Sequence, residues 1–278
     1  MTIPSKDKIL QLRYFGFLQT PNLWKENTVY QLKQLELDTN IDAISIAINE
    51  QLRLGKYVEQ FVMFNLSQQQ HINLLANNIQ IQQEKRTIGE LDCIYKEKES
   101  IVHLEIVYKF YLYLPDKNKE ELNCLVDPNR RDALIEKLVK LKDKQLQLLF
   151  HNSTKPYLQN LNITSNNIQQ EVCFKAQVFL PLKNKNIVLQ ELNNNCIAGF
   201  YLNVNELANF KDCKFYIPIK KDWLLIPHQE VSWLSFNDFK AIAKSLLSDK
   251  YSPLCWLKKS TGQIEKFFLV WWFEYLTQ

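Results

Sequence analysis

The order of apolar and polar residues predicts a β-hairpin in the first half of the chain. Residues 88–95 and 102–113 each alternate between the two kinds of side chain, and the charged segment 96–100 separates them. Alternation with a period of two indicates strands whose successive side chains point to opposite faces of a sheet. One face of the second strand is continuously apolar, and we expect it to be buried in a core. This face comprises Val102, Leu104, Ile106, Tyr108, Phe110 and Leu112.

The other face of the hairpin places two carboxylates opposite each other. A two-residue loop at 98–99, or a four-residue loop at 97–100, puts Asp92 directly across from Glu105. Because like charges at opposed positions destabilise a sheet, the arrangement indicates a divalent cation between them. The alternative is an ordinary antiparallel pair whose acidic face lies in water.

Helical periodicity on either side of the hairpin adds two candidate residues. Residues 46–66 predict an amphipathic helix, with Glu59 at the border of its apolar stripe. Gly55, one turn earlier, would let this helix approach a sheet closely, although Glu59 taken alone would be interpreted as a solvated residue. Residues 132–150 predict a second helix, in which Gln145 projects into the middle of the apolar stripe. A buried amide needs hydrogen-bond partners, either in the acidic site or from backbone and water.

The remaining pattern divides the chain into two parts. Short helices are expected within 5–37 and a first strand at 78–83, and the segment 151–170 is rich in Asn, Ser, Thr and Gln, which is typical of a boundary. We therefore expect one domain at 1–150 and a C-terminal part at 171–278. The second part predicts strands at 172–182, 196–202, 213–219 and 253–259, helices at 204–210 and 236–247, and an aromatic core segment at 267–276.

Composition limits the class of protein. The 278 residues carry a formal charge of +4. This mild basicity is compatible with binding to nucleic acid but does not by itself indicate it. The six cysteines lack CxxC spacing, which does not favour a zinc site and suits free thiols in a reducing cytoplasm. Since no signal peptide and no apolar run of membrane-spanning length is evident, we expect a cytoplasmic protein that does not enter the membrane. The five glycines form no phosphate-cradling loop, and the sequence leaves the oligomeric state open.

Four segments resemble a known family: LGKYVEQFV at 54–62, RTIGELD at 86–92, HLEIVYKFYL at 103–112 and DPNRRDALIEKLVKLKDKQLQLL at 127–149. The family is an uncharacterised bacterial one, domain of unknown function 1853, which is grouped by similarity with the PD-(D/E)XK nuclease superfamily. The resemblance implies an α/β fold with a PD-(D/E)XK (restriction-endonuclease-like) core, in which helices flank a mixed sheet. A smaller α+β part of unknown role would follow this core.

The resemblance also implies a set of site residues. The helix Glu, the strand Asp and the second-strand Glu of the superfamily fall on Glu59, Asp92 and Glu105, which would hold Mg²⁺ or Mn²⁺. In the superfamily a lysine follows this last Glu by two residues, and that position is Val107 here. Lys109, four residues after Glu105, would then stabilise the charge that develops in the transition state.

Two of these assignments have an alternative. Lys109 could pair diagonally with Glu90 on the neighbouring strand. Gln145 is similar to a Gln on the helix after the catalytic strand in some nucleases of the superfamily, but backbone or water could also satisfy it. The resulting hypothesis is a Mg²⁺-dependent phosphodiesterase, a nuclease that acts on DNA or RNA. The alternative function is a non-catalytic module with the nuclease fold that binds nucleic acid or a protein partner.

Overall fold

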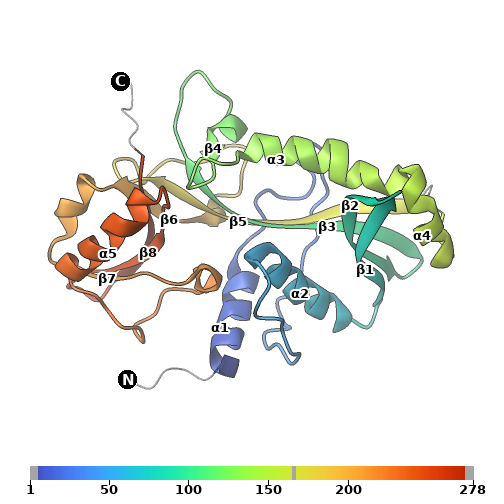
Figure 1. Cartoon of the computed structure of the whole chain (residues 1–278), viewed down its shortest axis with the longest axis horizontal. Helices are drawn as coiled ribbons and strands as arrows, with labels where there is room; N and C mark the ends of the chain where they lie inside the picture. Colours follow the sequence, from blue (N-terminus) through green and yellow to red (C-terminus); the bar gives the residue numbers. More distant parts are fainter. Residues whose placement is uncertain (1–5, 165–166, 273–278) are drawn as a thin grey trace. The chain divides into compact units, whose positions relative to one another are not determined.

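A computed structural model describes residues 6–164 and 167–272 and shows a mixed α/β fold (Figure 1). Its contacts divide the chain into two compact units. The first consists of Met1–Tyr108, Ile135–Ala176 and Glu191–Asn193, and the second of Lys109–Leu134, Gln177–Gln190 and Asn194–Gln278. Both units are therefore discontinuous in sequence, and their boundaries do not follow the division at 151–170 that the polar composition indicates.

The first unit contains the hairpin and the helices around it. Two strands, β3 (Ser100–Tyr113) and β5 (Ile168–Pro181), continue from this unit into the second. The other elements are α1 (Lys6–Gln19), α2 (Leu54–Ser67), β1 (Ile72–Gln83), β2 (Arg86–Glu97), α3 (Leu134–Lys140), the π-helix η2 (Leu141–Gln145), the 3-10 helices η3 (Leu146–Phe150) and η4 (Asn152–Thr154), and α4 (Lys155–Asn160).

The second unit holds the remaining short strands and one longer helix. Its elements are η1 (Glu121–Cys124), β4 (Leu125–Val126), η6 (Asn194–Cys196), β6 (Ile197–Asn203), η7 (Glu206–Phe210), β7 (Lys214–Tyr216), η8 (Lys220–Leu224), α5 (Phe236–Ser248), β8 (Leu254–Lys258) and β9 (Ile264–Val270). The nine strands form one sheet in the order β1-β2-β3-β5-β6-β9-β8-β7, and β4 pairs with β3.

The hairpin between β2 and β3 closes with a two-residue turn, the shorter of the two loops that the sequence allows. Glu97 pairs with Ser100, so Lys98 and Glu99 form the turn, and Lys98 adopts a positive φ of 53°. The antiparallel register runs from this pair to Cys93↔Leu104 and ends there. Asp92 and Glu105 are the next positions along the two strands, just beyond the paired segment. The strand β1 pairs with β2 from Ile72↔Glu97 to Gln83↔Arg86, and it begins six residues before the predicted first strand at 78–83.

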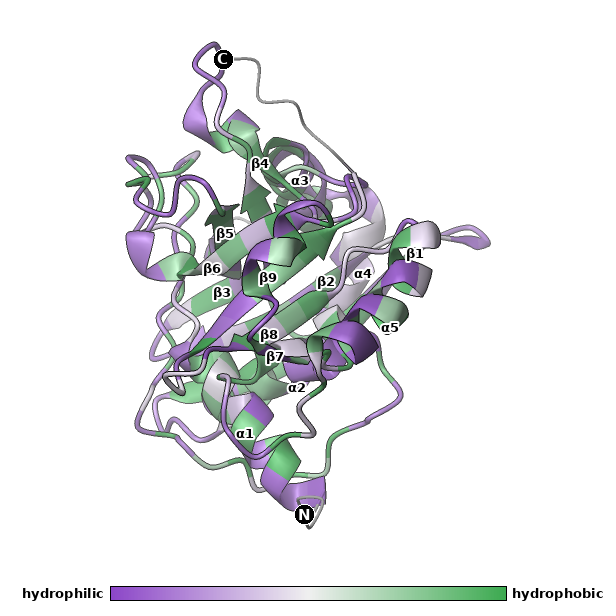
Figure 2. Ribbon diagram, turned by 90° about the vertical axis from the view of Figure 1, so that its left-hand side faces the viewer, coloured by the Kyte–Doolittle hydropathy of each residue, from purple (hydrophilic) through white to green (hydrophobic). Residues whose placement is uncertain are grey.

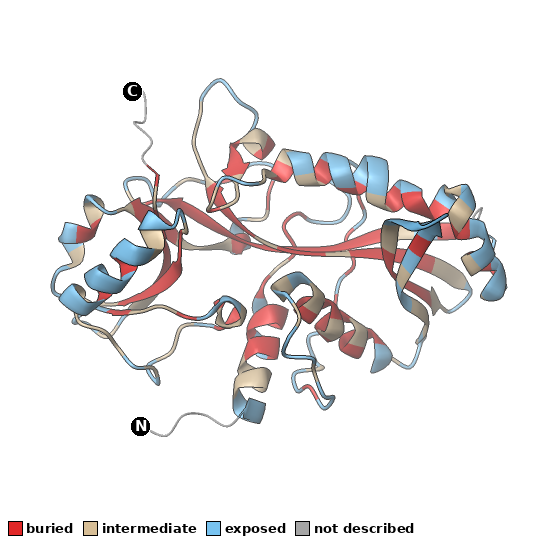
Figure 3. Cartoon of the chain, in the orientation of Figure 1, coloured by how far each residue is buried: buried red, intermediate tan, exposed pale blue. Residues whose placement is uncertain are grey.

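Helices cover both faces of the β1–β3 part of the sheet. The helix α2 lies on one face, and the continuous helical run of α3, η2 and η3 lies on the other (Figure 1). The apolar stripe predicted for α2 is buried, and η3 contributes Leu148 and Leu149 to a core with Ile81 and Leu91. Most of β3 is consequently buried (Figure 3). Because His103 and Glu105 are 0% exposed, the acidic face of this strand does not lie in water.

Three segments differ from the elements that periodicity predicts. The helix expected at 46–66 begins only at Leu54, because the residues before it form other bonds: Asn49 N donates to Gln60 Oε1 at 2.9 Å, and Glu50 pairs with Arg13 at 2.9 Å. The helix expected at 132–150 is divided into α, π and 3-10 segments. Of the short helices expected within 5–37, α1 is the one that the described residues 6–37 contain. The residues after it bond to β5, with Leu23 N donating to Phe174 O at 2.8 Å.

The four strands predicted after residue 171 are present: β5 is longer than predicted, β6 has the predicted length, and β7 and β8 are shorter. The strand β6 runs parallel to both β5 and β9, whereas β8 is antiparallel to its neighbours β9 and β7. Phe200, Phe215 and Phe267 belong to the core of the second unit, to which α5 contributes Phe239 and Ala243. Figure 2 shows that the strands of the sheet carry many hydrophobic residues. The segment predicted as helix at 204–210 is the 3-10 helix η7, and the expected core segment at 267–276 begins inside β9. Its residues 273–276 lie outside the described residues.

Within residues 6–164 and 167–272, no helix combines the length and the apolar character that crossing a bilayer demands.

Candidate metal centre

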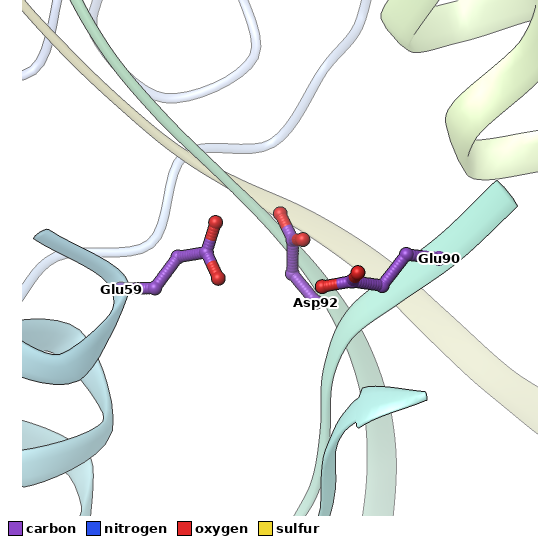
Figure 4. Close-up of side chains that lie close together, drawn as sticks. All are labelled: Glu59, Glu90 and Asp92. Carbon is purple, nitrogen blue, oxygen red and sulfur yellow. The ribbon is translucent and has the colours of Figure 1, made fainter. Parts of the chain in front are cut away.

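Three carboxylates from two elements converge in the first unit. Glu90 and Asp92 alternate along β2 and share one face of the strand, and α2 packs over that face and supplies Glu59. Each of the three offers an oxygen that lies within 4.8 Å of the others. Figure 4 shows the side chains of Glu59 and Glu90 directed toward Asp92 from opposite sides. Glu59 and Asp92 are buried, whereas the side chain of Glu90 is 20% exposed.

One lysine contacts all three carboxylates. Lys56 lies one turn before Glu59 on α2, and its Nζ is 2.7 Å from Glu59 Oε2 and 3.6 Å from Asp92 Oδ1. The same ammonium pairs with Glu90 and donates to Asn78 Oδ1 at 3.1 Å. Burial lowers the pKa of Lys56, but its hydrogen bonds to Glu59 and Glu90 outweigh burial and raise the pKa above its ordinary value. Lys56 is therefore protonated, and one positive charge faces three acidic groups.

The cluster keeps an excess of buried negative charge. Burial raises the pKa of Glu59 to about 7, and the charge of Asp92 adds to the rise. Burial also raises the pKa of Asp92 to about 6, reinforced by the charge of Glu105, although Asp92 accepts a hydrogen bond from Ile106 N at 2.9 Å. Both shifts have the sign expected where carboxylates crowd together without enough positive charge. A bound cation would remove this repulsion.

Glu105 is held by the protein on both of its oxygens. Gln145 Nε2 donates to Glu105 Oε2 at 2.6 Å, and His103 Nε2 is 3.1 Å from Glu105 Oε1. Lys137 Nζ donates to Gln145 Oε1 at 2.6 Å, which fixes the orientation of the amide because an ammonium can only donate. The π-helix η2 ends at Gln145 and so carries this side chain to the sheet, as π segments often do at functional sites.

The histidine beside Glu105 is oriented by a second amide. Gln170 Nε2 donates to Leu146 O at 2.7 Å, so its amide nitrogen is also the atom 3.1 Å from His103 Nδ1. In this geometry Nδ1 accepts, and the proton on Nε2 is donated to Glu105. Glu105 thus lies in a complete hydrogen-bond network and acts on the cluster through its charge beside Asp92.

The residues singled out from the sequence divide into those inside the cluster and those beside it. Glu59 and Asp92 meet in the cluster, and Gln145 reaches Glu105. Lys109 forms an ion pair with Asp132, and not the pair with Glu90 that was the alternative. The expected role of Gly55 is wrong, because a Cβ added there would have no neighbour within 4 Å and close packing does not require a glycine.

Sequence reasoning missed three groups that complete the site: Lys56, Glu90 and His103. Glu90 had a usable signal, since it precedes Asp92 by two residues and so shares its strand face. Likewise, His103 precedes Glu105 by two residues and so shares its strand face. Lys56 was harder to find, because its role depends on which face of α2 packs over β2.

The donor set fits a hard divalent cation. Mg²⁺ and Mn²⁺ prefer oxygen ligands, and two atoms bound to one Mg²⁺ at 2.0–2.1 Å are at most about 4.2 Å apart. The oxygens of Glu59, Glu90 and Asp92 lie within 4.8 Å of one another, so small side-chain movements would bring them to one ion. Glu105 is less suited to direct coordination, because both of its oxygens already accept hydrogen bonds.

Comparison with known proteins identifies one family. A family model described as a domain of unknown function (DUF1853) matches residues 14–270 and so spans parts of both units. No curated protein and no solved structure matches the chain.

Proposed function

We propose that this chain, which belongs to the DUF1853 family, is a metal-dependent phosphodiesterase that cleaves nucleic acid. The observation that carries the proposal is the cluster of Glu59, Glu90 and Asp92, whose negative charge exceeds the single positive charge of Lys56. A helix Glu beside a strand Asp resembles the arrangement of the PD-(D/E)XK nucleases. Glu90 is an additional carboxylate in this chain.

Each residue of the site has a distinct role in the proposal. Glu59, Glu90 and Asp92 hold Mg²⁺ or Mn²⁺. The bound ion would supply Lewis-acid stabilisation of a phosphoryl oxygen and lower the pKa of a water molecule. Lys56, whose ammonium already touches these carboxylates, stabilises negative charge on the phosphoryl group undergoing transfer.

The network around Glu105 supports the cluster from the other side. Gln145 and His103 hold Glu105 in one orientation, and Glu105 adds negative charge next to Asp92. A carboxylate fixed in this way strengthens the attraction of the site for a cation without having to bind it. His103 and Gln145 are therefore positioning residues.

The test is cleavage of labelled duplex DNA, single-stranded DNA and RNA by purified protein in Mg²⁺, in Mn²⁺ and in EDTA. We expect cleavage of at least one substrate only when metal is present. Asp92→Ala, which removes a proposed ligand, should lower the rate by about 10² or more. Lys56→Met should lower the rate by a similar factor, because a cation that stabilises transition-state charge is lost.

Lys109→Met is the matched control for Lys56→Met. Lys109 pairs with Asp132 and should leave the rate unchanged when it is replaced. If Lys109→Met loses activity while Lys56→Met retains it, Lys56 is not the residue that stabilises the transition state. The role would then belong to Lys109, as the resemblance to the superfamily implies. If Asp92→Ala cleaves at the wild-type rate, the activity does not belong to this site.

A second candidate function is binding without cleavage, and one observation favours it. Lys56 bridges Glu59 and Glu90 and so occupies part of the space where a cation would bind. A chain that kept the nuclease fold as a binding module could use such an internal ion pair in place of a metal. Absence of cleavage with every substrate, together with no stabilisation by Mn²⁺, would support this function.

A further inference from the structure

A row of amide side chains begins at the carboxylate cluster and follows β1. Gln80 pairs with Glu90 across the strands, and Gln82 lies opposite Thr87, to whose Oγ1 its amide donates at 2.7 Å. The intervening Ile79 and Ile81 pack into the core on the other face. Asn78 accepts a hydrogen bond from Lys56, and Gln80 donates to Glu90, so the row is continuous with the cluster.

The amide row is open to solvent. Asn78, Gln80 and Gln82 are all exposed, and at about 3.3 Å per residue the row extends about 13 Å from Asn78 to Gln82. In the order of the described strands, β1 is the terminal strand and neighbours only β2. Among the described strands, the outer edge of β1 therefore has no neighbouring strand.

The turn at the end of the β1–β2 ribbon is charged, and residues of the ribbon end line two hollows. Exposed Lys85 and Arg86 at the turn outnumber the one acid there, Glu84. An open hollow of about 370 Å³ lies beside the turn, and Gln83, Asp143 and Lys144 are among the residues that line it. A second hollow of about 380 Å³ is lined by Gln82, Gln83 and Glu84 of the ribbon and by polar residues that include Ser153 and Asn160.

We propose that the β1–β2 ribbon enters the major groove of duplex DNA, where its amides contact base edges and its terminal cations contact phosphates. The major groove is about 12 Å wide and admits a two-stranded ribbon, and Asn and Gln amides bond bidentately to the edge of adenine. The major groove of duplex RNA is too deep and narrow for such contacts. The inference rests on the proposed function, because it places a phosphate of the same duplex at the carboxylate cluster.

The test is equilibrium binding of fluorescent duplexes, measured by anisotropy with Ca²⁺ in place of Mg²⁺. Gln82→Ala should weaken binding to an A·T-rich duplex by about 5-fold or more and affect a G·C-rich duplex less. Lys85→Ala should weaken binding to both duplexes equally. It should also make the slope of log binding constant against log salt concentration less steep, by the amount expected for about one phosphate contact. Gln159→Ala and Lys117→Ala, at exposed positions outside the ribbon, are the matched controls and should bind like wild type.

Three results would overturn the inference: no binding to duplex DNA, equal binding by Gln82→Ala and wild type, or preference for RNA. Since the assay needs no cleavage, its outcome is distinguishable from that of the proposed function. A protein that cleaves DNA but binds normally after both ribbon substitutions refutes the inference alone. A protein that shows the expected binding changes but cleaves nothing refutes the proposed function and leaves the ribbon as its means of binding.

Discussion

Replacing Asp92 with Asn should stabilise the metal-free protein. Burial, reinforced by the charge of Glu105, raises the pKa of Asp92 from 3.8 to about 6. An acid whose pKa is higher in the folded state opposes folding at neutral pH, because deprotonation favours the unfolded chain. At 1.36 kcal/mol per pKa unit, the shift corresponds to about 3 kcal/mol at pH 8. Asn removes the charge and retains an oxygen that can accept the hydrogen bond from Ile106 N.

The effect has a defined pH dependence. The destabilisation by Asp92 is complete above pH 6 and disappears as the pH falls from 6 toward 3.8, where the carboxyl group is protonated in both states. We therefore expect Asp92→Asn to raise the free energy of unfolding by about 1 to 3 kcal/mol at pH 8 and by about half as much at pH 5.

Thermal unfolding in EDTA, followed by circular dichroism, measures the change. For a chain of this size the gain corresponds to an increase in Tm of about 2 to 10 °C at pH 8. Asp143→Asn, at an exposed position of the same unit, should change Tm little. Adding Mn²⁺ should raise the Tm of wild type and have little effect on Asp92→Asn, because the ion stabilises only the state that binds it. A lower Tm for Asp92→Asn in EDTA at pH 8 would refute the reasoning from buried repulsion.

Two further predictions concern the second unit. Lys266, on β9, donates to Gln177 Oε1 at 2.8 Å, and burial lowers its pKa to about 7. Between this pKa and that of an unfolded lysine, the folded state binds fewer protons than the unfolded state. The free energy of unfolding therefore increases as the pH rises, by up to about 1.4 kcal/mol per pH unit. Lys266→Met should remove this slope in urea denaturation between pH 7.5 and 9, and equal slopes would show that the lysine stays charged. Gly199→Ala should lower the free energy of unfolding by about 2 kcal/mol or more in the same assay, because the added Cβ would lie 2.1 Å from Lys266 O. Gly55→Ala is the control, because a Cβ there has no neighbour within 4 Å.

The sequence predicts the parts of the site that depend on local periodicity. The hairpin turn follows from the alternation on either side of 96–100, and the apolar stripe of α2 follows from its helical spacing. Periodicity says less about which elements pack together. The contact of Lys56 with β2 requires knowing how α2 is rotated against the sheet, and the pairing of Lys109 with Asp132 joins residues 23 positions apart.

The irregular segments were the least predictable for a related reason. Residues 22–35 have the apolar content of a helix, but the two ends of this segment bond to β5, and bends and turns connect them. Likewise, no local rule places a π segment at Leu141–Gln145, since the choice depends on what Gln145 and the leucines after it contact. Tertiary contacts therefore override local preference where the structure is least regular.

The π segment has a consequence for how this helix can change in evolution. A π turn contains about one residue more than an α turn, so it rotates everything after it by about 100° relative to an uninterrupted α-helix. Here that rotation lets one helix present Gln145 to Glu105 and Leu148 to the core beside Ile81. Deletion of a single residue within 141–145 would remove the π turn and force the helix to keep one contact and lose the other. Insertions and deletions should therefore be rare at this point of the chain, even though many of its side chains are exposed.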